Sequence, residues 1–202
     1  MAKLMASARK FLERREGARR LRSLKGGPIK LIIGASGTDQ EGFTPTDQAY
    51  LDLLAPEQWR RFFEPDSIAV IFAEHVWEHL SPADARRAAR TCHEFLARGG
   101  YLRVAVPDGL HPNPDYVDRV RPGGSGPEAH EHQVLYTHAT FRQVFEQVGF
   151  RVELLEYFDE TGAFHASPWD PAGGLVRRSA RFDQRNVGGA LVYTSVILDA
   201  VK

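Results

Sequence analysis

The stretch IKLIIGASG at residues 29–37 joins an apolar run to two glycines. Residues 29–33 are short, apolar and rich in β-branched side chains, which predicts a buried strand. Gly34 and Gly37 follow directly, and glycine permits positive φ and a close approach of the backbone to a ligand. This order of strand and turn is typical of the first unit of an α/β sheet that binds a ligand at its edge.

Further elements alternate along the chain. Strands are predicted at residues 43–46, 67–73, 101–106, 152–158 and 192–201, and helices at 56–63, 81–96 and 137–148. Ser81 is the expected N-cap of the second of these helices, with Pro82 at its first position, and Gly99 and Gly100 are expected to end it. Strands separated by helices predict a mainly parallel sheet.

Length and composition favour one soluble α/β domain. The chain has 202 residues, of which 43% are hydrophobic, enough for a sheet covered on both faces. Its apolar runs are too short to cross a bilayer, and basic residues interrupt the N-terminal segment where a signal core would lie. The single cysteine, Cys92, excludes an intramolecular disulfide and a Cys-rich zinc site. We expect a cytoplasmic protein with no membrane partner.

The zero net charge conceals a basic N-terminus. Residues 1–25 carry nine Lys/Arg and two Glu, a charge of +7 that the rest of the chain balances. Apolar positions 4, 8, 11, 12 and 18 share one helical face, so residues 1–26 are predicted as a basic amphipathic helix preceding a domain at 27–202. We expect this helix to pack on the domain or on a second copy in a homodimer, without a specific nucleic-acid role, because no aromatics interleave with its arginines.

The loops that follow the predicted strands are candidate site segments, since parallel α/β sheets bind ligands at the carboxyl ends of their strands. The loop after the first strand lacks the spacing of a phosphate loop and the third glycine of a dinucleotide fingerprint. Asp39 and Glu41 would repel a pyrophosphate. The loop therefore favours a ligand without phosphates, and Asp47, just past the second strand, is placed to accept hydrogen bonds from ribose hydroxyls.

Five segments together resemble a known enzyme family. They are GASG at 34–37, GFTPTD at 42–47, AEHVWEHL at 73–80, RGGYLRVAVPD at 98–108 and YTSVILDAVK at 193–202. Their order and spacing are similar to those of an uncharacterised bacterial subgroup of class I S-adenosylmethionine-dependent methyltransferases. The resemblance extends over about residues 29–202.

The resemblance implies a Rossmann-like, doubly wound, seven-stranded sheet with an antiparallel last strand. It also implies S-adenosylmethionine as methyl donor and S-adenosylhomocysteine as product. The residues expected at the donor are Gly34, Ala35, Ser36 and Gly37 at the methionine and ribose, Asp47 at the ribose hydroxyls, Asp52 or Leu53 at the adenine, and Ala73, Glu74 and His75 at the methionine end. Two features depart from the family pattern: Ala35 and Ser36 stand where Cys and Gly are common, and the first crossover helix is nearly absent.

The segment 107–131 is long and rich in Pro, Gly, Asp and His, as functional loops often are. Histidine can act as a base near neutral pH, so His132, His130 or His111, assisted by Asp108, is a candidate to deprotonate an acceptor. Two other interpretations stay open: these side chains order a wet loop, or His130 and His132 bind a metal with His111 or Asp108. The prediction that we favour contains no metal.

The sequence thus predicts methyl transfer to a small-molecule acceptor of unspecified chemistry. Two alternatives are a cofactor-binding module that has lost catalysis, and a metal-dependent enzyme that uses the loop of His130 and His132. The first would bind the donor without turnover, and the second would retain a metal on purification.

Overall fold

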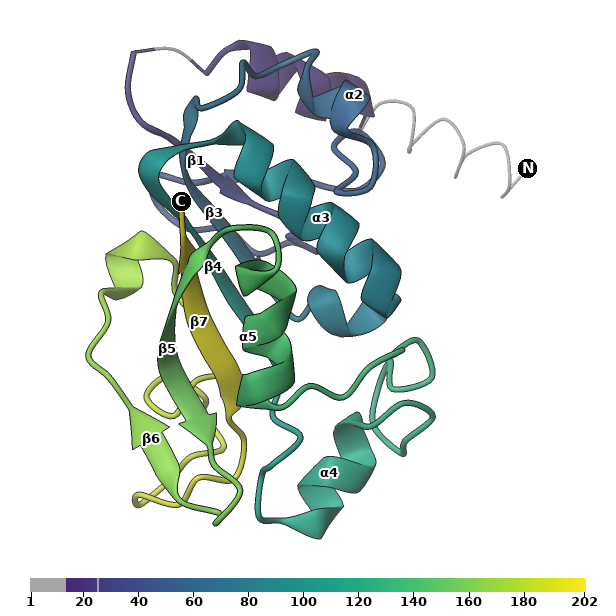
Figure 1. Cartoon of the computed structure of the whole chain (residues 1–202), viewed down its shortest axis with the longest axis vertical. Helices are drawn as coiled ribbons and strands as arrows, with labels where there is room; N and C mark the ends of the chain where they lie inside the picture. Colours follow the sequence, from purple (N-terminus) through teal and green to yellow (C-terminus); the bar gives the residue numbers. More distant parts are fainter. Residues whose placement is uncertain (1–13, 25) are drawn as a thin grey trace.

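The computed structural model describes residues 14–24 and 26–202, which are built on one seven-stranded sheet (Figure 1). The strand order is β2-β1-β3-β4-β7-β5-β6. The strands are β1 Ile29–Ile32, β2 Thr44–Pro45, β3 Ile68–Glu74, β4 Leu96–Pro107, β5 Arg151–Phe158, β6 Phe164–Ala166 and β7 Ser195–Val201. β1 to β4 are parallel, whereas β7 is antiparallel to β4 and β5, and β6 to β5. The predicted mainly parallel, Rossmann-like sheet with an antiparallel last strand is confirmed.

Two helices, α3 Pro82–Phe95 and α5 His138–Glu146, pack side by side on one face of the sheet (Figure 1). α3 begins as predicted, because the Ser81 side chain accepts a hydrogen bond from the Asp84 amide at 3.1 Å. Phe95, Phe141 and Phe145 project from these helices into the larger hydrophobic core and are fully buried. The short α2, Pro56–Trp59, adds the indole of Trp59 to the same core.

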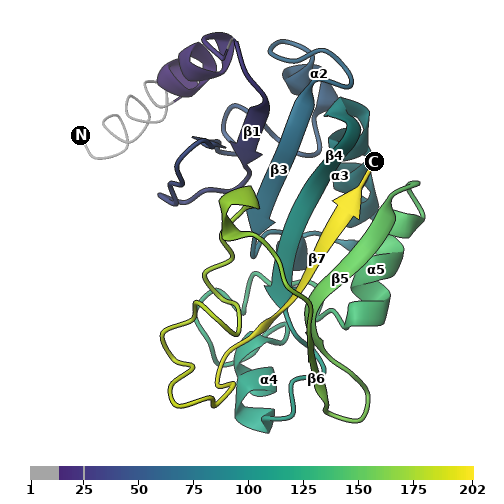
Figure 2. The ribbon, with the colours of Figure 1, turned by 90° about the vertical axis from the view of Figure 1, so that its left-hand side faces the viewer.

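The opposite face is covered by residues 167–194, a segment with the 3₁₀ turn η2 Pro171–Gly173 and no α-helix among its described residues (Figure 2). Arg103 on β4 holds this segment to the sheet. Its guanidinium, 4% exposed, binds both carboxylate oxygens of Asp199 at 2.8 Å and the carbonyls of Asp170 and Gly174. A bidentate buried pair of this kind fixes geometry as well as energy.

The end of α3 differs from the prediction. The helix ends at Phe95 and β4 starts at Leu96, so Gly99 and Gly100 lie inside the strand and do not cap the helix. The pairing of β3 with β4 shifts in register here. Gly99 has φ +76°, and a Cβ on Gly100 would lie 2.8 Å from the Ala69 carbonyl oxygen. These glycines therefore allow the irregular pairing of β3 with β4. In the sequence they look the same as glycines that end a helix.

The long loop is also more ordered than predicted. It contains α4, Pro114–Val120, whose first turn is capped by Asn113 accepting from the Asp115 amide at 2.9 Å. The pair Asn113-Pro114 is itself a helix-start signal that the composition of the loop conceals. The last strand begins at Ser195, three residues later than predicted.

The described part of the N-terminal helix covers residues 14–22. Leu21 is 2% exposed within the larger core, and the Arg22 guanidinium lies 5.5 Å from the centre of the Phe62 ring. This part therefore packs on the domain. The apolar positions 4, 8, 11 and 12 lie outside the described residues. Within the described ranges, no helix is both long and apolar enough to span a bilayer.

Candidate active site

The turn after β1 is the tightest point of the site. Gly34 has φ +62° and Ser36 has φ +42°, a conformation that favours glycine. A Cβ on Gly34 would lie only 2.8 Å from Cγ2 of Val76, so any larger residue would displace the loop that follows β3. The Ala35 amide donates to the Thr46 carbonyl at 3.1 Å, which ties the turn to the end of β2. The chain passes from β1 to β2 without a crossover helix, as the sequence predicts.

A hollow of ≈470 Å³ opens beside this turn. Such a volume is typical of sites for cofactors and other small ligands. Gly34 and Ser36 line one side of it, and Asp52 and Leu53 another. The Asp52 carboxylate is held in place because its Oδ1 accepts from the Leu54 amide at 2.8 Å. The structure thus brings the glycine turn and the pair 52–53 to one cavity, called here the first hollow.

Five other expected donor residues do not line the first hollow: Ala35, Gly37, Asp47, Ala73 and Glu74. Asp47 is exposed at the end of β2, where its Oδ1 accepts from the Ala49 amide at 2.7 Å. Ala35 lines another hollow of ≈780 Å³ together with Glu74. Ala73 is 1% exposed within the core.

The end of β3 turns sharply at His75, which has φ +55°. The short 3₁₀ turn η1, Trp77–His79, follows, so His75 precedes the helical turn that carries His79. The Ser195 hydroxyl donates to the Arg178 carbonyl, so Nε2 of His75 donates to Ser195 Oγ at 3.1 Å. Burial lowers the pKa of His75 well below its usual value, which keeps the ring neutral.

A second hollow, of ≈250 Å³, lies on the other side of His75. Its lining includes Glu78, His79, Arg119, His132, Arg178 and Tyr193. The rings of His79 and His132 meet edge to face with centres 4.8 Å apart. Nδ1 of His132 lies 2.7 Å from the Val120 carbonyl oxygen and must donate to it, so Nε2 is the unprotonated nitrogen in the neutral ring.

Glu78 is the most unusual side chain of the second hollow. It is 1% exposed, yet neither carboxylate oxygen has a hydrogen-bond partner. Nδ1 of His75 lies 3.2 Å from its Oε1 without hydrogen-bond geometry. Burial raises the pKa of Glu78 to about 8. Burying a carboxylate without partners is costly, and such groups in native proteins usually have a functional reason.

The predicted catalytic side chains of the long loop do not all lie at the second hollow. Asp108 is fully buried and accepts from the amides of Phe158 and Leu110 at 2.7 and 2.9 Å. Both ring nitrogens of His111 bind backbone, namely the Leu191 carbonyl and the Asn113 amide. These two side chains organise the loop and do not line the second hollow.

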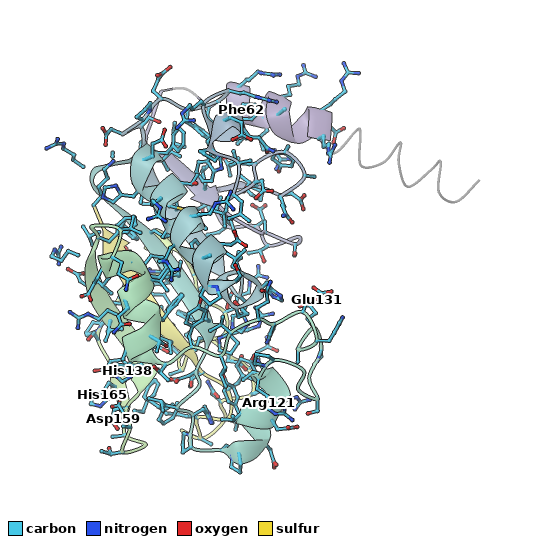
Figure 3. The ribbon with its side chains drawn as sticks, turned by 45° about the vertical axis from the view of Figure 1, so that its right-hand side comes forward. Phe62, Arg121, Glu131, His138, Asp159 and His165 are labelled. Atoms are coloured by element: carbon cyan, nitrogen blue, oxygen red, sulfur yellow. The ribbon has the colours of Figure 1, made fainter. Side chains whose placement is uncertain are left out.

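His130 belongs neither to the pair Asp108 and His111 nor to the lining of the second hollow. Its side chain is 76% exposed, and its Nε2 lies 3.6 Å from Oε1 of Glu131. Figure 3 shows Glu131 and Arg121 on the loop side of the molecule, away from the labelled His138, Asp159 and His165. The structure thus does not bring His130 and His132 together with His111 or Asp108 as one set of metal ligands. Of the predicted catalytic residues, only His132 lines the second hollow.

Sequence reasoning did not assign Glu78, Arg178 or Tyr193 to the site. Glu78 stands inside the AEHVWEHL segment, where an acid directly after a tryptophan was the available signal. Arg178 comes from the irregular segment 167–194, which has no periodicity that could have placed it over the sheet, and Tyr193 was expected in the last strand but precedes it. Their position depends on the packing of that segment against β4 and β7.

The sheet order and the hollows beside the ends of β1 and β3 are those of a Rossmann-like α/β protein. Residues 16–155 match the family described as "Methyltransferase domain", and the chain belongs to this family. It is a methyltransferase whose methyl donor is S-adenosylmethionine. No curated protein sequence matches the chain.

Solved structures similar to the chain share little sequence with it. An S-adenosylmethionine-dependent methyltransferase from Archaeoglobus fulgidus is 12% identical, with 94% of this chain and 92% of that chain covered and a TM-score of 0.48. A possible histamine N-methyltransferase from Thermotoga maritima is 13% identical, with 98% and 96% covered and a TM-score of 0.49. Phosphoethanolamine N-methyltransferase 2 from Haemonchus contortus is 14% identical, with 91% and 50% covered and a TM-score of 0.45.

Proposed function

We propose that this enzyme methylates a small, anionic acceptor held in the second hollow, with the donor in the first. One observation carries the proposal: His75, His79 and Glu128 line both hollows, so the two cavities meet along a shared wall. The donor supplies an electrophilic methyl group on a sulfonium. Transfer is an in-line displacement, and holding the two reactants in adjoining cavities accounts for most of the catalysis.

The donor side is assigned to the glycine turn and to residues 52–53. The absence of a Cβ at Gly34 makes room for Val76, which lines the same hollow, and Leu53 offers an apolar contact for the adenine. Asp47 remains our candidate for the ribose hydroxyls, and Asp52, which lines the cavity, is the competing candidate.

Titration with S-adenosylhomocysteine tests this assignment. Asp47→Ala should weaken binding by about 1–3 kcal/mol if this carboxylate holds the ribose, and Asp52→Ala should then have a smaller effect. Gly34→Ala should weaken binding through its clash with Val76. Gly37→Ala is the matched control, because Gly37 also has positive φ but a Cβ there would meet nothing within 4 Å. Equal losses in both glycine variants would remove the Val76 contact from the explanation.

The acceptor side favours an anion. Arg119 and Arg178 line the second hollow; the Arg178 amide donates to the Glu74 carboxylate at 2.7 Å, but its guanidinium lies 3.9 Å from that carboxylate. Arg185 is already paired with Asp183. Guanidinium groups bind carboxylates and phosphates through paired N–H donors. A substrate with a carboxylate or phosphate group would bind to Arg119 and Arg178, which are less engaged than Arg185.

Release of S-adenosylhomocysteine across pairs of acceptors that differ only by an anionic group tests this proposal. The anionic member of each pair should be preferred, and Arg178→Gln should raise KM about 10–100-fold with a smaller change in kcat. Arg177→Gln is the control, since Arg177 lines only the ≈780 Å³ hollow. Equal turnover of neutral and anionic members would contradict an anionic acceptor, and no turnover of any candidate would contradict small-molecule methylation.

A further inference from the structure

We propose that Glu78, His79 and His132 form a binding site for a divalent transition-metal ion at the wall of the second hollow. Each of the three side chains offers a ligand atom, and these atoms lie within 4.8 Å of one another. Ligands of a bound Zn²⁺ sit about 2.0–2.2 Å from the ion, so side-chain shifts of roughly 1 Å would close the site.

The protonation pattern of His132 suits a metal ligand. Its Nδ1 donates to the Val120 carbonyl at 2.7 Å, which fixes the tautomer and leaves the Nε2 lone pair available. Histidines that bind metals almost always make such a hydrogen bond through their other ring nitrogen. His79 adjoins it edge to face, and its carbonyl accepts from the Gln133 side chain at 2.8 Å, which links η1 to the loop that carries His132.

The surroundings of Glu78 supply a second, independent observation. Its side chain is 1% exposed at the wall of the second hollow, and neither of its oxygens has a hydrogen-bond partner within the described structure. Nδ1 of His75 lies 3.2 Å from Oε1 without hydrogen-bond geometry. A bound cation would supply the partner that these oxygens lack, because buried charges in proteins are paired or coordinate metals.

The ligand types determine which ion fits. Two imidazoles and one carboxylate are the donors of sites for Zn²⁺, Co²⁺, Mn²⁺ and Fe²⁺, whereas Ca²⁺ and Mg²⁺ prefer oxygen ligands alone. Three protein ligands leave coordination positions open. All three line the second hollow, so the open positions would face it. A role in orienting an acceptor oxygen there rests on the function proposed above, but the metal site itself does not.

The test is titration of untagged, chelator-treated protein with Co²⁺, followed by visible absorption, and competition by Zn²⁺. We expect a single equivalent bound, with Mg²⁺ and Ca²⁺ unable to displace it. His132→Ala should lower Co²⁺ affinity by at least about 100-fold, since even outer hydrogen-bond partners of a ligand contribute 10–100-fold. Glu78→Gln should lower it because an amide oxygen is a weaker ligand.

His130→Ala is the matched control, because this exposed histidine lies two positions from His132 and should leave Co²⁺ affinity unchanged. Circular dichroism and melting curves verify that each variant is folded. Equal Co²⁺ affinity in wild type and His132→Ala, or a loss in His130→Ala, would overturn the site. Failure to bind Co²⁺ alongside active methyl transfer would remove the metal and keep the proposed function. Binding of Co²⁺ without turnover of any acceptor would keep the metal site and contradict the proposed function.

Discussion

Two buried carboxylates differ in their hydrogen bonding: Asp108 lies at the end of β4, and Glu78 lies in η1. Asp108 and Glu78 are 0% and 1% exposed. Asp108 accepts two backbone N–H groups and so joins the end of β4 to β5, whereas neither oxygen of Glu78 has a hydrogen-bond partner. Buried polar groups that are fully bonded fix a structure, and those left unbonded at a cavity wall are candidates for binding.

Two histidines of the same loop differ in their hydrogen bonding in a similar way. His111 uses both ring nitrogens on backbone groups and stacks on Tyr116 with ring centres 4.0 Å apart. His132 uses Nδ1 on a backbone carbonyl, and one of its ring nitrogens lies within 4.8 Å of a Glu78 carboxylate oxygen. The loop 107–132 therefore has side chains bonded to backbone near its start and a histidine that lines the second hollow near its end.

The largest expected effect concerns Asp108. Asp108→Ala leaves the buried amides of Phe158 and Leu110 without an acceptor and should lower the free energy of unfolding by about 2–4 kcal/mol. Urea denaturation measures the loss. Asp108→Asn keeps one oxygen and should lose about half as much. A stability within about 0.5 kcal/mol of wild type in Asp108→Ala would break the comparison.

His111 should give an intermediate effect. His111→Ala removes two hydrogen bonds and the contact with Tyr116, and should lower the free energy of unfolding by about 1–3 kcal/mol. The affinity for S-adenosylhomocysteine should stay near that of wild type, because His111 does not line the first hollow. A variant of normal stability and lost turnover would instead assign His111 to catalysis.

The stability contribution of His111 should also depend on pH. Burial lowers its pKa, so the unfolded chain binds this proton more readily than the folded one. Stability that is present above the unfolded value of about 6.5 is then lost as pH falls toward the folded pKa. Between pH 7 and pH 5, His111→Gln should lose less stability than wild type in parallel denaturation curves. Identical slopes would mean that folding does not lower the pKa of His111.

Glu78 should give the smallest change in stability. In metal-free protein, Glu78→Gln removes a carboxylate that has no hydrogen-bond partner, so the free energy of unfolding should change by less than about 1 kcal/mol. The same urea experiment serves for measurement, with Asp108→Asn as the matched acid-to-amide control. A loss as large as that of Asp108→Asn would show that Glu78 is a structural group, and the contrast between the two acids would fail.

The sequence by itself determined the fold class and the position of the glycine turn after the first strand. β-branched runs, a Ser81 cap and glycines after the first strand are local signals, and the strands and α3 formed close to where these signals lie. The carboxyl-edge rule then placed the glycine turn and His75 at one cavity without any knowledge of packing.

Only the tertiary structure decided which polar residues are free to act. Asp108 and His111 looked like catalytic candidates because their residue types and loop suit that role, but backbone groups of Phe158 and Leu191, about 50 and 80 positions further along the chain, occupy them. Glu78, His79 and His132 meet because the loop returns to η1, and Arg178 arrives from the irregular segment over the sheet. Pattern and propensity describe neighbours along the chain, whereas hydrogen-bond partners and cavities depend on contacts between distant segments, which is why the sequence could propose these residues but not choose among them.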